Sequence, residues 1–498
     1  RGVSVADTQK YFLARKSDAE RSLKKVSGRI RLLRITIRIY TVLIFLLNAL
    51  LMLTMGASGF KFGIALFSVY IFFGCLGRIK KARKGDFSGY TDPGKYPYLH
   101  SLAKKAAKTF GIRGNVRIML MPDCNAGIAR IGGTFSLQLG IVMLYMLSEE
   151  ELYQVLLHEF AHMTPGCIPS ENETELFEEI ASREKSDFDR IMDLMFAFFD
   201  RLYLFEYFMY RTTASLYIEK LADDAVLKYG TPEIAASALM KIDFYSKYEF
   251  CERGKELFFE PEEMRRDGVS GICREFKASL SENEGLWRHL IDVEIEPRSA
   301  SHPILRNRLA ALGVSGVRLI DNTADSSSQY RQETEKAVSE GDEMMYEYNK
   351  EDYAEKRRVY YLEPLETVRK WEESGRKVLP EEARPVIDAL CKLNRIEEAE
   401  ELCDKIISES ENVYATAHAH FVKGQLMTER CDKGGIDHLY KAIEINKNYT
   451  DSALELIGNV CCMLGLSDEL EKYREFAVKT EQEQRDKYSE LPGLKSSD

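Results

Sequence analysis

Two apolar runs near the N-terminus place the strongest constraint on how this chain can fold. The first extends from Ile39 to Met55 and the second from Phe62 to Gly77, with a short, more polar stretch between them. Runs of about 17 residues are at the short end of what crosses the hydrocarbon core of a bilayer. Neither run carries the regularly spaced charges of a half-exposed helix. We therefore predict a transmembrane helical hairpin over residues 35–84 that contacts the lipid bilayer. Two buried helices of a soluble domain are the alternative.

Charge is distributed very unevenly along the chain. Residues 1–85 contain 17 basic and three acidic side chains, a balance of +14, so the total of −10 leaves −24 for the remainder. Because basic flanks stay on the cytoplasmic side, we predict an integral protein of a bacterial cell membrane with both termini and the large C-terminal part in the cytoplasm. The ten scattered cysteines, without CxxC pairs, suit a reducing compartment. A mildly acidic chain is a poor candidate for nucleic-acid binding, and we expect no nucleic-acid partner.

The segment that follows predicts two strands and a well-defined helix. Val116 to Met121 has the composition of a strand. Thr134 to Ile141 alternates apolar and polar residues, which is typical of an edge or half-buried strand. Ser148 followed three residues later by Glu151 is a capping-box signature for a helix that should end near Thr164.

That helix contains the sequence HEFAH, an HExxH motif. A spacing of four places His158 and His162 on one helix face, where their imidazole nitrogens can bind a single zinc ion. Glu159 then lies beside the metal, in the position of a general base. We therefore predict one Zn²⁺ per chain.

A zinc ion held by two histidines needs a third protein ligand, and Glu219 is the best candidate. It lies on an apolar-periodic run that ends near Gly230. Asp223 shares its helix face, so one carboxylate can bind zinc while the other orients a ligand histidine through its second nitrogen. Spacing alone is equally consistent with Glu219 as a solvated helical acid.

These motifs resemble the HtpX-like and CAAX prenyl protease superfamily of membrane zinc metallopeptidases, the gluzincins. The resemblance covers about residues 95–315 and rests on three signatures in order: the HExxH motif, the run Glu219 to Asp223 with its Ala222-Asp223 pair, and Ser301-His302-Pro303 with Arg308. It implies that Glu219 is the third zinc ligand and that Asp223 supports a ligand histidine.

The resemblance also implies that His302 and Arg308 line the active site. There an imidazole or a guanidinium group would stabilise the oxyanion of a tetrahedral intermediate. A structural cap or core pair is an equal alternative for His302. The chain departs from the family pattern in its long aromatic interval between the first two signatures. Residues 187–211 are expected to pack on the catalytic core or lie at a membrane surface, with full spanning as the alternative.

The C-terminal third predicts paired short helices. The run Tyr440 to Asn446 resembles the second helix of a tetratricopeptide repeat, and an ordinary helical bundle is the alternative. We therefore predict a mainly α fold with a small β-sheet, in which a zincin-like α+β peptidase domain follows the hairpin. The expected segments are a basic N-terminal segment (1–34), the hairpin (35–84), the HExxH zinc metallopeptidase domain (85–320), a charged linker or helix (321–379) and repeats similar to tetratricopeptide repeats (380–498).

Together these patterns predict a membrane-anchored zinc endopeptidase that acts on membrane or membrane-proximal proteins. An extended substrate would pair with an edge strand at Thr134 to Ile141, and the repeats would bind a protein partner. The alternative is a membrane-tethered adaptor built on the repeats, with a structural or vestigial zinc site. Cys167 is the candidate fourth ligand in that case, because a structural site is usually closed by a fourth protein donor.

Overall fold

The computed structural model describes residues 89–131, 133–164, 216–251, 259–297, 302–314, 319, 326–379 and 382–489, with a few isolated residues among the first 50. This part of the chain is mostly helical and contains one small sheet. The predicted hairpin over residues 35–84, apart from isolated positions, and the aromatic segment 187–211 lie outside the described residues.

The transmembrane part of the predicted fold class is contradicted. Among the described residues, no helix combines the length and the apolar character that crossing a bilayer requires. The longest described helices, α9 (Gly268–Val293), α11 (Ser328–Lys350) and α19 (Ser467–Ser489), carry charged residues along their length, and such charges are costly in hydrocarbon. The predicted fold class with a transmembrane hairpin and the predicted integral-membrane location are both corrected accordingly. The described fold is mostly helical and includes one three-stranded sheet.

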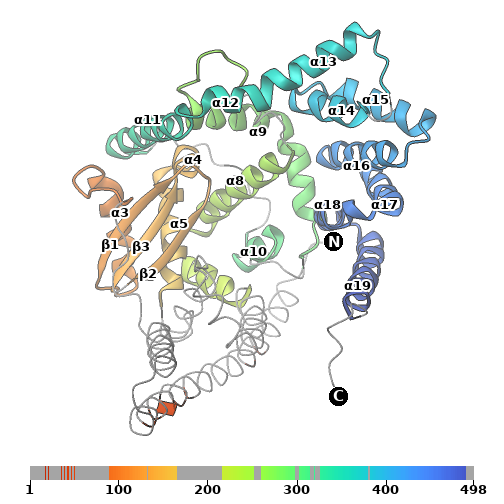
Figure 1. Cartoon of the computed structure of the whole chain (residues 1–498). Coiled ribbons are helices and arrows are strands. Elements are labelled where there is room, and N and C mark those ends of the chain that lie inside the picture. The colour runs from red at the N-terminus through yellow and green to blue at the C-terminus, as the bar shows by residue number, and fades with distance from the viewer. Residues whose placement is uncertain are drawn as a thin grey trace.

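The sheet places the second predicted strand at its centre. β3 (Thr134–Gly140) pairs in parallel with β1 (Asn115–Met121) and antiparallel with β2 (Ala126–Ile131), as Figure 1 shows. The edge position expected for Thr134 to Ile141 is therefore wrong. The alternating pattern suggested one solvent-exposed face, but Ser136, a polar residue on that face, is buried. Its hydroxyl lies 2.5 Å from the Tyr90 hydroxyl, with which it forms a hydrogen bond. The edge nearest the HExxH helix is β2, which the alternation did not reveal.

The helix with the HExxH motif begins at the predicted cap. In α5 (Glu149–His162) the Ser148 hydroxyl accepts from Glu151 N–H, and the Glu151 carboxylate accepts from Ser148 N–H in return. Glu151 is also fully buried and bonds the Lys241 ammonium at 2.7 Å and the Ser237 hydroxyl at 2.7 Å, both in α8 (Pro232–Cys251). One carboxylate therefore closes the first turn of α5 and fixes α5 against α8.

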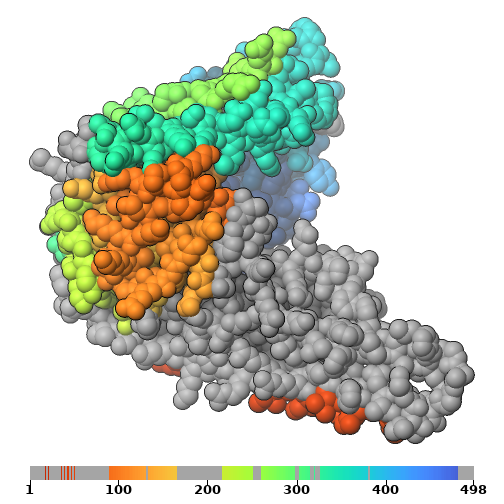
Figure 2. Space-filling model, turned by 90° about the vertical axis from the view of Figure 1, so that its left-hand side faces the viewer, coloured from red at the N-terminus to blue at the C-terminus, as the bar shows by residue number. Residues whose placement is uncertain are grey.

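The highly charged helix α11 is anchored to the sheet domain on one face. The Glu333 carboxylate accepts the backbone N–H groups of Tyr98 and Leu99, at 2.7 and 2.8 Å, in the first turn of α3 (Pro97–Thr109). A negative charge at this position complements the partial positive charge of a helix N-terminus. The Tyr330 hydroxyl is buried and donates to Leu147 O. Figure 2 shows the teal segment that contains α11 lying along the orange surface that contains α3.

Helices of different lengths continue to the C-terminal end of the described chain. They are α12 (Tyr353–Arg357), η3 (Arg358–Leu362), α13 (Glu363–Glu373), α14 (Ala383–Lys392), α15 (Ile396–Glu409), α16 (Val413–Glu429), α17 (Gly435–Ile445), η5 (Lys447–Tyr449), α18 (Thr450–Met463) and α19 (Ser467–Ser489). α13 to α16 share one apolar cluster, whereas buried residues of α17 and α18 join the cluster that contains α9. Ile295 N–H donates to Cys462 O at 2.7 Å, which ties the end of α9 to α18.

Candidate metal centre

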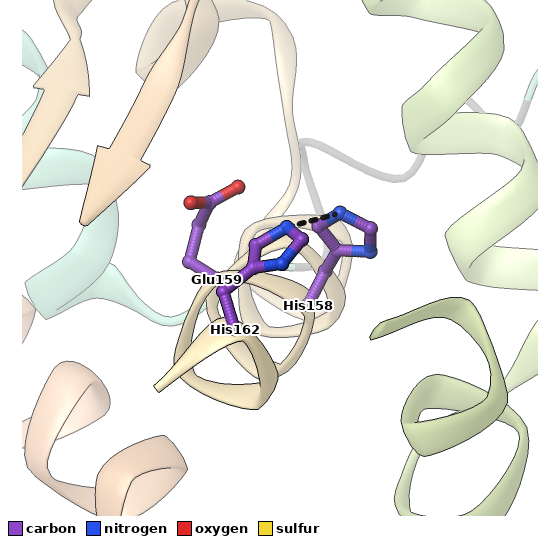
Figure 3. A group of neighbouring side chains, drawn as sticks. All are labelled: His158, Glu159 and His162. Atoms are coloured by element: carbon purple, nitrogen blue, oxygen red, sulfur yellow. Dashed lines mark hydrogen bonds between the residues drawn. The ribbon is translucent and has the colours of Figure 1, made fainter. Parts of the chain in front are cut away.

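Two imidazoles project from the last turns of α5 toward one point. The Nε2 atoms of His158 and His162 lie 3.1 Å apart, and their rings meet edge to face with centroids separated by 4.7 Å. Figure 3 shows both side chains on the same side of the helix, as the four-residue spacing requires. Both are largely buried, with side chains 11% and 17% exposed, so few water molecules compete for their nitrogens.

The third donor comes from a helix over residues 216–229. Glu219 Oε2 lies 3.2 Å from His158 Nε2, and Glu219 Oε1 lies 3.4 Å from His162 Nε2. The residue is buried, and Oε2 has no hydrogen-bond partner among the described residues. Its neighbours are the positively charged groups His158 and, at 3.6 Å, Arg308 Nη1, and a buried carboxylate needs such compensation by positive charge.

The spacing of these donors fits a zinc ion. Ligand atoms placed 2.0–2.1 Å from a tetrahedral zinc are separated from each other by about 3.3 Å. The Nε2 atoms of the two histidines are 3.1 Å apart, and Glu219 approaches them through different oxygens, Oε2 at 3.2 Å from His158 and Oε1 at 3.4 Å from His162, all close to that value. Two imidazoles and one carboxylate are also a donor set that zinc accepts, with a fourth position open for water. These three residues would hold the metal.

Asp223 contacts the second ring nitrogen of His158, and Arg308 holds Asp223. Asp223 Oδ1 lies 3.0 Å from His158 Nδ1, the nitrogen that faces away from Glu219. Arg308, from α10 (Leu305–Ala311), donates to both Asp223 oxygens, at 3.0 Å from Nε and 2.8 Å from Nη2. Its Nη1 also lies 3.6 Å from Glu219 Oε2. The predicted residues His158, Glu219, Asp223 and Arg308 therefore form one buried network.

Electrostatics keep the carboxylates of this network ionised. Burial acts against it, but the charges and hydrogen bonds of His158 and Arg308 lower the pKa of Asp223, and those of the histidines lower the pKa of Glu219. Burial and Arg308 disfavour a charged His158, yet the two carboxylates outweigh them and raise the pKa of His158 to about 10. The site is thus arranged to hold positive charge.

Glu159 lies close to both imidazoles. Figure 3 shows its carboxylate beside the two imidazoles, and one donor atom of each of the three residues lies within 4.8 Å of the others. Burial raises the pKa of Glu159, against the opposing charges of His158 and His162. A carboxylate with a raised pKa is a better proton acceptor than an ordinary glutamate.

His302 approaches the centre from the solvent side. Its Nδ1 lies 3.1 Å from Glu219 Oε1, while 64% of the side chain is exposed. It therefore reaches a ligand residue without being buried in the core. Arg308, by contrast, is buried, and besides its bonds to Asp223 its Nη2 lies 3.3 Å from His158 Nδ1 and 3.4 Å from His158 Nε2. Cys167, the candidate fourth ligand, lies outside the described residues.

A cavity of about 320 Å³ adjoins the candidate ligands. It is bounded by the start of β2, by α5, by the 216–229 helix, by α8 and by α10. The sequence did not identify the residues of α8 that line this cavity as functional. Helical periodicity marks a buried face, but it does not distinguish a face in the core from a face on a cavity. The lining residues of α8 are Ala235, Ala238, Leu239, Ile242, Asp243 and Ser246.

No protein-family model matches this chain, and no curated protein sequence matches it. The resemblance to HtpX-like peptidases therefore stays a prediction that rests on the three sequence signatures.

Proposed function

We propose that this protein is a zinc-dependent endopeptidase. The observation that supports the proposal most directly is the meeting of three candidate ligands. The Nε2 atoms of His158 and His162 lie 3.1 Å apart, and the two Glu219 oxygens lie 3.2 Å and 3.4 Å from them, one from each. A glutamate lies next to them in the HExxH arrangement, and a cavity opens beside them. A metal held by three protein ligands beside a cavity keeps a coordination position for water, which is the arrangement of catalytic rather than structural zinc sites.

The residues of the chain divide the work of peptide hydrolysis. Bound zinc would lower the pKa of a coordinated water to about 7 and polarise the scissile carbonyl. Glu159 accepts the proton of the attacking water and then delivers it to the leaving amine. Asp223 holds the His158 ring in the orientation that presents Nε2 to the metal, and Arg308 holds Asp223.

The substrate is placed against β2 rather than β3. β3 is paired on both sides, whereas the outer edge of β2 pairs with no other described strand. Asn125 and Ala126, at the start of β2, line the same cavity as His158 and Glu159. An extended peptide added to this edge would therefore pass the metal ligands.

The test is cleavage of an unfolded protein such as casein by the purified, zinc-loaded chain. Glu159→Gln should retain zinc and lose at least about a hundredfold in rate, because general acid–base catalysis contributes on that scale. Glu150→Gln, an exposed acid on the same helix, is the matched control and should keep full activity. Equal cleavage by wild type and Glu159→Gln would reject Glu159 as the base, and absence of any cleavage would reject the peptidase.

A second candidate function is an adaptor with a structural zinc site. It is favoured by the helical C-terminal region and by His302, whose Nδ1 lies close enough to Glu219 to supply a fourth donor. Measurements of zinc content and spectroscopy of the cobalt-substituted protein distinguish the peptidase from the adaptor. A water-exchangeable fourth position supports the peptidase, whereas a closed site lost in His302→Ala supports the adaptor.

A further inference from the structure

The cavity beside the metal ligands has an apolar wall on one side. Ala235, Ala238 and Ile242 recur at intervals of three and four, so they line the cavity as one stripe of α8. Val226, Leu305 and Leu312 add apolar side chains from the neighbouring helices. Such a surface receives the aliphatic part of a substrate side chain.

Asp243 interrupts this apolar lining with a carboxylate. It lines the cavity, and 22% of its side chain remains exposed. Its hydrogen-bond partner is Lys247, one turn further along α8, at 2.6 Å. Burial raises the pKa of Asp243 in spite of that partner. The carboxylate is therefore incompletely compensated for its loss of water.

Lys247 is shared between two acids, which explains why the charge of the Asp243 carboxylate is incompletely compensated. The ammonium is buried and also lies 3.5 Å from Glu294 Oε2, an atom with no hydrogen-bond partner among the described residues. Burial raises the pKa of Glu294 as well. Arg306 is close, but its terminal nitrogens donate to the carbonyl oxygens of Asp292 and Glu294. One ammonium thus serves two partly buried carboxylates.

The charges around the rest of the cavity also favour a basic substrate side chain over an acidic one. Glu159, Glu219, Asp223 and Asp243 line it, and Arg308, already bonded to Asp223, is the one Lys or Arg side chain among the described lining residues. An acidic substrate side chain would add a further buried negative charge. A basic side chain would place its stem on the stripe of α8 and its charged head at a carboxylate that lacks a full complement of donors.

We propose that Asp243 is a specificity-determining residue that binds the head of a lysine or arginine side chain located close to the scissile bond. The cavity then selects substrates with a long, basic residue at that position and rejects those with an acidic one. This inference rests on the proposed peptidase function, and it adds a substrate class to it.

The experiment compares peptides that differ at single positions around the cleaved bond. Lysine, arginine, norleucine and glutamate are placed at each position in turn, and kcat/KM is measured with the zinc-loaded full chain. The expected result is a preference for lysine or arginine over norleucine of about tenfold or more at one position, as hydrogen bonds to a charged group provide. Glutamate there should be the poorest substrate.

Variants separate recognition from folding. Asp243→Asn should lower kcat/KM for the basic peptides about ten- to hundredfold while the norleucine peptide changes little, and Asp243→Glu should restore part of the basic preference. Asp352→Asn is the matched control, since Asp352 pairs with Lys356 at the same four-residue spacing on α12, away from the cavity. It should leave all peptides unchanged.

The outcomes are distinguishable from those of the casein test. Cleavage of casein together with no basic preference, or with a preference that Asp243→Asn leaves intact, overturns the role of Asp243 and leaves the peptidase standing. Failure of zinc-loaded protein to cleave any peptide or casein removes the peptidase and this inference with it.

Discussion

Arg308 donates two hydrogen bonds to the Asp223 carboxylate, from Nε at 3.0 Å and from Nη2 at 2.8 Å. The two residues are separated by 85 positions in the chain. Both side chains are almost fully buried, at 11% and 3% exposure. Asp223 in turn contacts His158 Nδ1. The orientation of a candidate zinc ligand therefore depends on a helix that lies far from the HExxH motif in sequence.

Replacing Arg308 should weaken the metal site without touching a ligand. In Arg308→Met the Asp223 carboxylate loses its charged partner, which for a buried pair costs about 3–5 kcal/mol in stability. Zinc affinity should fall about ten- to a hundredfold, the usual effect of removing a group that orients a ligand. Chelator competition measures the affinity, and Arg358→Met, at an exposed pair, is the control. Unchanged affinity in Arg308→Met would contradict this support role.

Zinc should stabilise the folded chain. The three donors meet only when α5 and the 216–229 helix are in place, so a metal that binds them favours the native state. At free zinc a hundred times the dissociation constant, the gain is about 2.7 kcal/mol. Thermal unfolding with zinc, with chelator and with magnesium measures it, and His162→Ala should abolish the zinc effect. An identical melting temperature with zinc and with chelator would speak against the site.

Breaking the buried pair between α5 and α8 should be strongly destabilising. Lys241→Met leaves the fully buried Glu151 carboxylate without its ammonium partner at 2.7 Å, a change that costs about 3–5 kcal/mol. Urea denaturation measures the loss, and adding Glu151→Leu should recover part of it. Lys472→Met, at the exposed pair with Glu469, should change stability by less than about 1 kcal/mol. A loss in Lys241→Met no greater than in Lys472→Met would refute this account.

Two histidines should make the stability of the fold decrease in mild acid. His420 Nδ1 lies 2.9 Å from His438 Nδ1, which joins α16 to α17. Burial, with the neighbouring His438 and two lysines, lowers the pKa of His420 to about 4, and burial also lowers the pKa of His438. The unfolded chain therefore takes up protons first, near its ordinary pKa of about 6.5. Stability contributed by the neutral pair should be complete above about pH 6.5 and decline as pH falls toward 4.

Urea titrations of wild type and His420→Asn between pH 7 and pH 4 check this expectation. The variant lacks the depressed imidazole, so its stability should vary less over that interval. Parallel curves for the two proteins would show that the pair does not contribute.

Local features of the chain were determined by the sequence alone. A capping box and a four-residue spacing involve neighbours on one helix, so Ser148, Glu151, His158 and His162 could be placed before any tertiary contact was known. Helical composition and a small sheet follow from similar local patterns. Glu219 could be nominated as a ligand, but its alternative as a solvated acid was settled by burial against both imidazoles.

Only the tertiary structure determined the features that depend on contacts between distant segments, such as strand pairing and charge compensation between helices. Alternation along Thr134 to Ile141 could not show that strands pair on both of its edges, because side-chain pattern reports burial and not hydrogen-bonding neighbours. The transmembrane fold predicted from hydropathy over residues 35–84 is corrected because no helix among the described residues could cross a bilayer; residues 35–84 themselves, apart from isolated positions, lie outside the described part of the chain. Asp223 and Arg308 were nominated separately from the sequence, but the bond between them was not predicted, and the partly compensated Asp243 had no signal in the sequence. Each depends on groups from different helices sharing one low-dielectric space, and charge compensation there is a property of the folded chain.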